Sequence, residues 1–141
     1  MTPFARIIVV VDGRPCGQHA LEAAVELAGA MGAELEALVV EGRQPLSASR
    51  IGGAQEAEDA RRSELALLAR IAGYQAVEAG IDLDVRIVRG STVAAIARRA
   101  GEAGADLVVI GRRSRDVGAL VRGSLAHRVA RQARCPVMIV S

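Results

Sequence analysis

Five short apolar segments alternate along this chain with longer alanine-rich segments. The five, expected to be β-strands, are residues 6–11, 34–40, 83–88, 106–110 and 136–140. Between them, apolar residues recur every three or four positions, which gives each intervening helix one apolar face. Strands joined by connections this long pair in parallel with right-handed crossovers. The sequence therefore predicts one domain over residues 1–141, a doubly wound three-layer α/β/α sandwich around a five-stranded parallel sheet.

The apolar patterns of the expected strands differ, and the differences predict their order. Residues 7–11 and 107–110 are continuously apolar, as strands covered on both faces are. Residues 83–88 instead alternate leucine, valine and isoleucine with charged residues, a pattern typical of an edge strand with one solvated face. Numbering the strands along the chain, we predict the order 3-2-1-4-5, in which the last strand forms the other edge.

Composition excludes several classes of function. Apolar residues make up 51% of the chain, but 27 are alanine and Phe4 and Tyr74 are the only aromatic residues. All eighteen basic residues are arginine, so a phosphate-loop lysine and a Schiff-base lysine are both excluded. A net charge of +2 and the scarcity of aromatic stacking residues disfavour nucleic acid as a partner.

The sequence also predicts a cytoplasmic protein without a membrane partner. The apolar run at residues 7–11 is too short for a signal peptide, and no segment approaches the length of a membrane span. Cys16, expected in a loop after the first strand, and Cys135 are too few for a disulfide framework. We expect both to be free thiols.

Ligands of such sheets bind at the carboxyl ends of the strands. Asp12 directly follows a buried run, where it would either accept hydrogen bonds from a ligand or close a turn with Gly13. Residues 41–53, after the second strand, are either a flap over this site or a solvated loop.

A second segment, residues 111–124, leads into the last helix. Gly123 and Ser124 there would place free backbone amides at the start of the helix, where they can bind phosphate. The same two residues are also ordinary helix caps. Four arginines of this segment add positive charge: Arg112, Arg113, Arg115 and Arg122.

Taken together, these segments resemble the universal stress protein family over nearly the whole chain. The resemblance rests on residues 7–13, 20–21, 33–35, 105–111 and 123–140. It implies a Rossmann-like, adenine-nucleotide-binding fold. ATP-binding members have a glycine, two residues, a glycine, nine residues and then Gly-Ser or Gly-Thr. Here Ser114 replaces the second glycine, and eight residues separate it from Gly123.

The resemblance also implies a binding site and a role. Asp12 and Val40 would flank adenine, Gly111 would lie near the ribose, and Gly123 and Ser124 would contact phosphates. The pocket would be completed by Val11, Ile110, Ser114 and Leu125. The implied ligand is ATP, ADP or AMP, with Mg²⁺ as companion.

The implied role is stress-response regulation together with an unidentified protein partner, and not enzyme activity beyond slow ATP hydrolysis. The implied homodimer forms through the last strand, at Val137, Met138, Ile139 and Val140. The alternative is a nucleotide-free dimeric interaction module, in which Gly123 and Ser124 only cap a helix.

Overall fold

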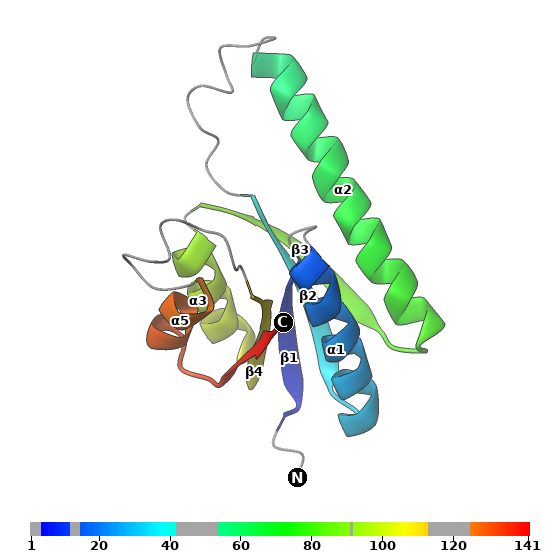
Figure 1. Cartoon of the computed structure of the whole chain (residues 1–141), viewed down its shortest axis with the longest axis vertical. Coiled ribbons are helices and arrows are strands. Elements are labelled where there is room, and N and C mark those ends of the chain that lie inside the picture. The colour runs from blue at the N-terminus through cyan, green and yellow to red at the C-terminus, as the bar shows by residue number, and fades with distance from the viewer. Residues whose placement is uncertain (1–3, 12–14, 42–53, 91, 113–124) are drawn as a thin grey trace.

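The computed structural model describes residues 4–11, 15–41, 54–90, 92–112 and 125–141 (Figure 1). The strands are β1 (Arg6–Val11), β2 (Glu34–Glu41), β3 (Leu83–Arg89), β4 (Leu107–Gly111) and β5 (Val137–Val140). The helices are α1 (Pro15–Met31), α2 (Ala54–Glu78), α3 (Thr92–Ala103) and α5 (Leu125–Gln132). Each expected strand is present, with ends that differ by at most one residue.

The five strands form one parallel sheet in the order β3-β2-β1-β4-β5. Helices α1 and α2 pack on one face, and α3 and α5 pack on the other (Figure 1). The predicted three-layer sandwich and strand order are therefore confirmed.

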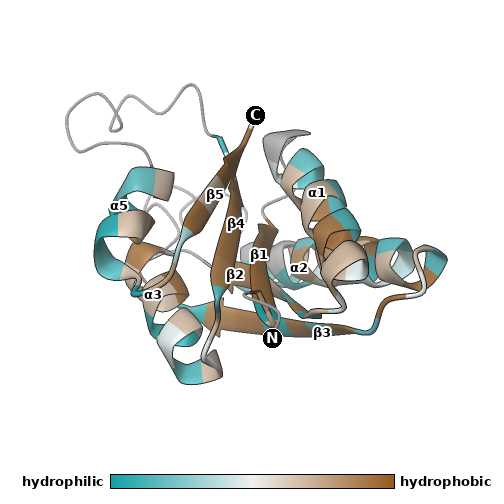
Figure 2. Ribbon diagram, turned by 90° about the horizontal axis from the view of Figure 1, so that it is seen from below, coloured by the Kyte–Doolittle hydropathy of each residue, from teal (hydrophilic) through white to brown (hydrophobic). Residues whose placement is uncertain are grey.

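The core is aliphatic, and β1 supplies its centre. Residues Ile7 and Val9 point to the α1 and α2 side, whereas Ile8 and Val10 point to the α3 and α5 side, and all four are almost fully buried. Alanines on α1 let that helix lie close to the sheet. Figure 2 shows the result as apolar central strands flanked by helices with polar outer faces. Burial of each large aliphatic side chain stabilises the fold by roughly 2 kcal/mol.

Two local expectations are corrected. Helix α1 begins at Pro15, so Cys16 lies in its first turn and not in a loop. Proline suits a first helical position because its fixed φ matches the helix. An N–H at this position would have no acceptor within the helix, so its absence costs no hydrogen bond. Strand β4 begins at Leu107, one residue later than expected, and the Asp106 carboxylate just before it accepts hydrogen bonds from the N–H groups of Ala5 and Arg6, each at 2.9 Å.

Strand β3 is an edge strand as predicted, but its apolar face is less covered than expected. Val85 is 38% exposed and Ile87 is 48% exposed. Figure 1 shows the reason, since α2 diverges from β3 beyond the turn that joins them. At the other edge, Met138 and Ile139 of β5 are exposed to a similar extent.

Candidate functional site

Several predicted site residues lie together at the carboxyl ends of β1, β2 and β4. Val11, Val40 and Gly111 stand at or next to the last residue of these strands, and Leu125 is the first described residue of α5. Asp12, Ser114, Gly123 and Ser124 lie outside the described residues.

Three of the predicted pocket residues share one apolar cluster. Val40, Ile110 and Leu125 pack on the α3 and α5 face of the sheet, where Ile110 and Leu125 are buried and Val40 is half-buried. Val11 is buried on the opposite face, against α1. Val40, Ile110 and Leu125 therefore belong to one apolar cluster, and Val11 belongs to a different one.

Gly111 continues the pairing of β4 and β5 to the edge of the sheet. It lies opposite Val140, and the N–H of Arg112 donates a hydrogen bond of 2.7 Å to the Val140 carbonyl. Gly111 is buried and Arg112 is exposed. The chain thus leaves the sheet with an arginine side chain in solvent, directly after a residue that has no side chain.

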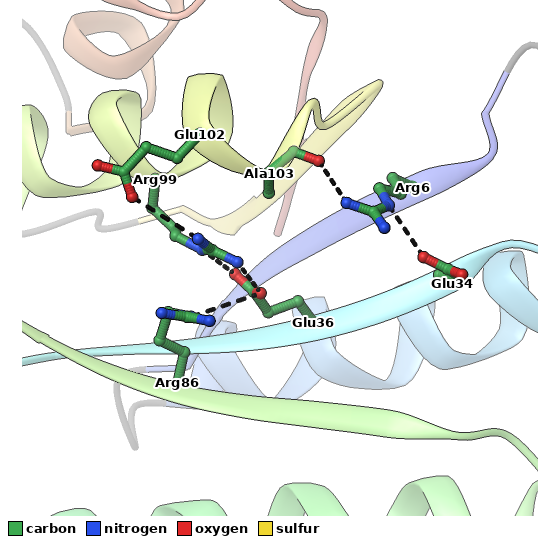
Figure 3. Close-up of polar contacts among 7 residues, drawn as sticks. All are labelled: Arg6, Glu34, Glu36, Arg86, Arg99, Glu102 and Ala103. Carbon is green, nitrogen blue, oxygen red and sulfur yellow. Dashed lines mark hydrogen bonds and ion pairs between the residues drawn. The ribbon is translucent and has the colours of Figure 1, made fainter.

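A charged cluster that the sequence analysis missed lies toward the opposite ends of the strands (Figure 3). The guanidinium of Arg99, on α3, donates two hydrogen bonds to the carboxylate of Glu36, on β2, at 2.9 and 2.8 Å. The side chains are only 16% and 14% exposed. Arg86 on β3 approaches Glu36 to 3.8 Å, and Arg99 approaches Glu102 to 3.6 Å. The hydrogen-bonded Glu36 carboxylate raises the pKa of Arg99, so the guanidinium stays charged.

A second pair extends this cluster to β1. Arg6 donates hydrogen bonds to the Glu34 carboxylate at 2.9 Å and to the Ala103 carbonyl at 2.7 Å (Figure 3). These side chains border a groove of about 540 Å³ over β1, β2 and β3. Arginines and acidic residues line the groove in equal number, so it presents no excess of either charge. The hydrogen bonds of Arg6 and Arg99 tie α3 to the sheet.

The sequence contained a signal for this cluster. Glu34 and Glu36 alternate with apolar residues in β2, which places both carboxylates on the face that α3 covers in part. A carboxylate on a covered face needs a cationic partner. The partner, Arg99, is 63 residues away along the chain, and only the fold brings the two together.

Cys135 is a free, half-buried thiol, as predicted, whereas the side chain of Cys16 lies outside the described part. Burial raises the pKa of the Cys135 thiol, with a smaller contribution from the Asp106 carboxylate. The neutral thiol is therefore favoured. Within the described ranges, no three histidine, cysteine or acidic residues gather as a metal site would require. No helix in these ranges is long and apolar enough to cross a membrane.

Comparison with known proteins identifies the family. The model of the universal stress protein family matches residues 3–141. The chain belongs to the universal stress protein family. Universal stress protein YxiE of Bacillus subtilis is 30% identical over an alignment 148 residues long. The alignment covers 97% of this chain and 99% of that relative. The resemblance inferred from the motifs is confirmed.

Two solved universal stress proteins show the same fold. One, from Burkholderia pseudomallei, is 28% identical, has a TM-score of 0.80, and the match covers 99% of this chain and 98% of the other. The second was crystallised in complex with cAMP. It is 26% identical with a TM-score of 0.74, and the match covers 98% of this chain and 97% of the other.

Proposed function

We propose that this universal stress protein is a regulatory module that binds an adenine nucleotide at the carboxyl ends of β1, β2 and β4. The observation that carries the proposal is its likeness, over 98% of the chain, to a universal stress protein solved in complex with cAMP. The ligand we propose is ATP, ADP or AMP, with Mg²⁺ accompanying the phosphates.

The chemistry of the carboxyl edge supports this choice. An adenine ring is flat and largely apolar, so it needs an apolar wall and a few polar groups at its rim. Val40, Ile110 and Leu125 share the cluster that would supply the wall. Asp12 would accept hydrogen bonds from the base end, and Val11 would support the end of β1 from the opposite face.

The phosphates would lie between Gly111 and the start of α5. Helix α5 directs its first backbone N–H groups toward this side of the sheet, and such groups favour anions. Gly123, Ser124 and Ser114 would supply the remaining contacts. No residue is assigned as a general base, so we propose regulation by bound nucleotide and not catalysis.

The test is ligand-induced stabilisation. A ligand that binds only the folded chain raises the melting temperature with concentration, and we expect this for Mg-ATP or for ADP or AMP. Gly123→Val would place a branched side chain at the phosphates and abolish the shift. Gly101→Val is the matched control, because Gly101 lies on α3 with open space where a Cβ would be.

The proposal would be overturned if the unmodified protein gave no saturable calorimetric heat with any adenine nucleotide. The Gly123→Val protein must also keep its fold, so that the variant tests binding and not folding. In that case the nucleotide-free interaction module takes its place.

We also propose a homodimer through β5. Its edge exposes Met138 and Ile139, and an uncovered apolar edge strand readily pairs with another chain. Ile139→Lys should remove the β5 contact and lower the particle mass measured by light scattering, whereas a wild-type monomer at all concentrations would exclude this interface.

A further inference from the structure

The outer edge of β3 has a sequence that is complementary to itself. Strand β3 ends the sheet and pairs with β2 alone among the described strands. Figure 2 shows it along one border of the described part of the molecule, with the apolar residues of the strand visible. An edge strand presents backbone N–H and C=O groups that another strand can pair with.

One face of this strand carries opposite charges two residues apart. Asp84 and Arg86 point to the same side, and both are exposed. The Arg86 Nε atom is 3.8 Å from Glu36, whose two carboxylate oxygens already accept hydrogen bonds from Arg99. A guanidinium has five N–H donors, so Arg86 keeps donors for a further partner.

The other face carries Leu83, Val85 and Ile87, of which Val85 and Ile87 are exposed because α2 diverges from the strand. These residues are large, apolar and β-branched or aliphatic, the types that stabilise neighbouring strands across a sheet.

These patterns match a second copy in one antiparallel register. A two-fold axis through Val85 places Asp84 opposite Arg86 of the second copy, and Arg86 opposite its Asp84. On the other face, Val85 meets its own copy and Leu83 meets Ile87. A two-fold axis through Asp84 or Arg86 would instead place like charges opposite each other, which is unfavourable. Axes between residues would oppose charged and apolar side chains.

We propose that the β3 edge binds a second copy of this chain in this register and joins two five-stranded sheets into one. The contact is isologous, since each copy contributes residues Leu83–Ile87 to the other. It goes beyond the proposed nucleotide site and lies at the opposite edge from β5.

Site-specific cross-linking tests the register. Only Val85 meets its own copy, so Val85→Cys treated with a short bismaleimide should give linked dimers. Ile87→Cys is the matched control, because Ile87 lies on the same face and is somewhat more exposed than Val85, but it faces Leu83 of the second copy. We expect Val85→Cys to link at least about tenfold faster than Ile87→Cys or the native thiols. Equal rates would overturn the proposal.

Charge exchange tests the pairing in the Val85→Cys protein. Asp84→Arg and Arg86→Asp each create two like-charge pairs and should reduce linking about tenfold. The combined exchange restores opposite charges and should restore linking. If the combined variant links as slowly as the single ones while all keep their melting temperature, the register is wrong.

A third test uses the unmodified chain, so it does not depend on whether a substituted protein folds. Amide hydrogen exchange at residues 83–87 should slow as protein concentration rises, in parallel with the linking yield. Exchange that does not change over that range would exclude the contact. Protection present only after addition of an extended peptide would assign the edge to a different partner.

Discussion

The two halves of β2 carry opposite chemistry. In the amino half, Glu34 and Glu36 hold Arg6 and Arg99 through hydrogen bonds of 2.9 Å or less. In the carboxyl half, Leu38 and Val39 are buried among aliphatic side chains, and Val40 borders the proposed site. The amino half thus binds neighbouring elements of its own chain with charge, whereas the carboxyl half presents an apolar surface toward the loops.

This difference separates stability from binding along one strand. A bidentate ion pair that is mostly buried directs its two charges at each other and fixes α3 on the sheet. Substitutions in the amino half should therefore change unfolding without changing nucleotide affinity, and substitutions at Val40 should change affinity more than their effect on unfolding explains.

The largest effect is expected for Arg99→Ala. It leaves Glu36 mostly buried without its main partner, which should lower the free energy of unfolding by about 3 kcal/mol in urea denaturation. Arg98→Ala is the control, because Arg98 is exposed and its ion pair with Glu102 is long at 3.7 Å. This substitution should lower the free energy of unfolding by under about 0.5 kcal/mol. Equal losses would show that the buried pair has no special role.

Replacing both partners sharpens this result. Glu36→Leu combined with Arg99→Leu removes both charges together, and should recover most of the stability that Arg99→Ala loses. A double variant as unstable as the single one would mean that the geometry of the ion pair itself, and not the avoidance of an unpaired charge, holds α3.

The next effect concerns the carboxyl half. Val40→Ala and Val88→Ala remove equal volumes from half-buried residues that face each other across β2 and β3. Each should cost about 1 kcal/mol of stability. Only Val40→Ala should also weaken nucleotide binding, by about fivefold in calorimetry. An equal loss of affinity in both variants would move the site away from β2.

A smaller effect is expected for Glu34→Gln. The Arg6–Glu34 pair is exposed, with side chains 54% and 74% accessible, so salt screens it. The change should lower the free energy of unfolding by less than about 0.5 kcal/mol, and raising the salt concentration should remove the difference. A larger loss of unfolding free energy that does not depend on salt would show that this pair behaves like the mostly buried pair of Glu36 and Arg99.

The smallest effect concerns the reactivity of Cys135 and leaves stability unchanged. Because burial raises the pKa of this thiol, its reactive thiolate should be scarce at neutral pH. Alkylation at Cys135, followed by peptide mapping, should be slower than for a cysteine in a short peptide. It should accelerate only above the ordinary thiol pKa. Rapid labelling at neutral pH would contradict the burial.

Local patterns were enough to predict the fold. The unbroken apolar runs of β1 and β4 require cover on both faces, which placed them at the centre. The apolar motif residues could likewise be assigned to strand ends. Pairings between distant segments could not be predicted: nothing near Glu36 indicates Arg99, and the alternation in β3 does not reveal that α2 diverges from it. Whether Asp12, Gly123 and Ser124 bind a ligand stays a prediction.

The place of Tyr74 has a spectroscopic consequence. It is the only tyrosine in a chain without tryptophan, and it lies 66% exposed on α2, away from the core. Its fluorescence will therefore respond weakly to unfolding, and far-ultraviolet dichroism is the better signal. The chain also absorbs little light in the near ultraviolet. Adenine absorbs far more strongly than tyrosine, so one nucleotide retained through purification would dominate the spectrum and shift its maximum to shorter wavelength.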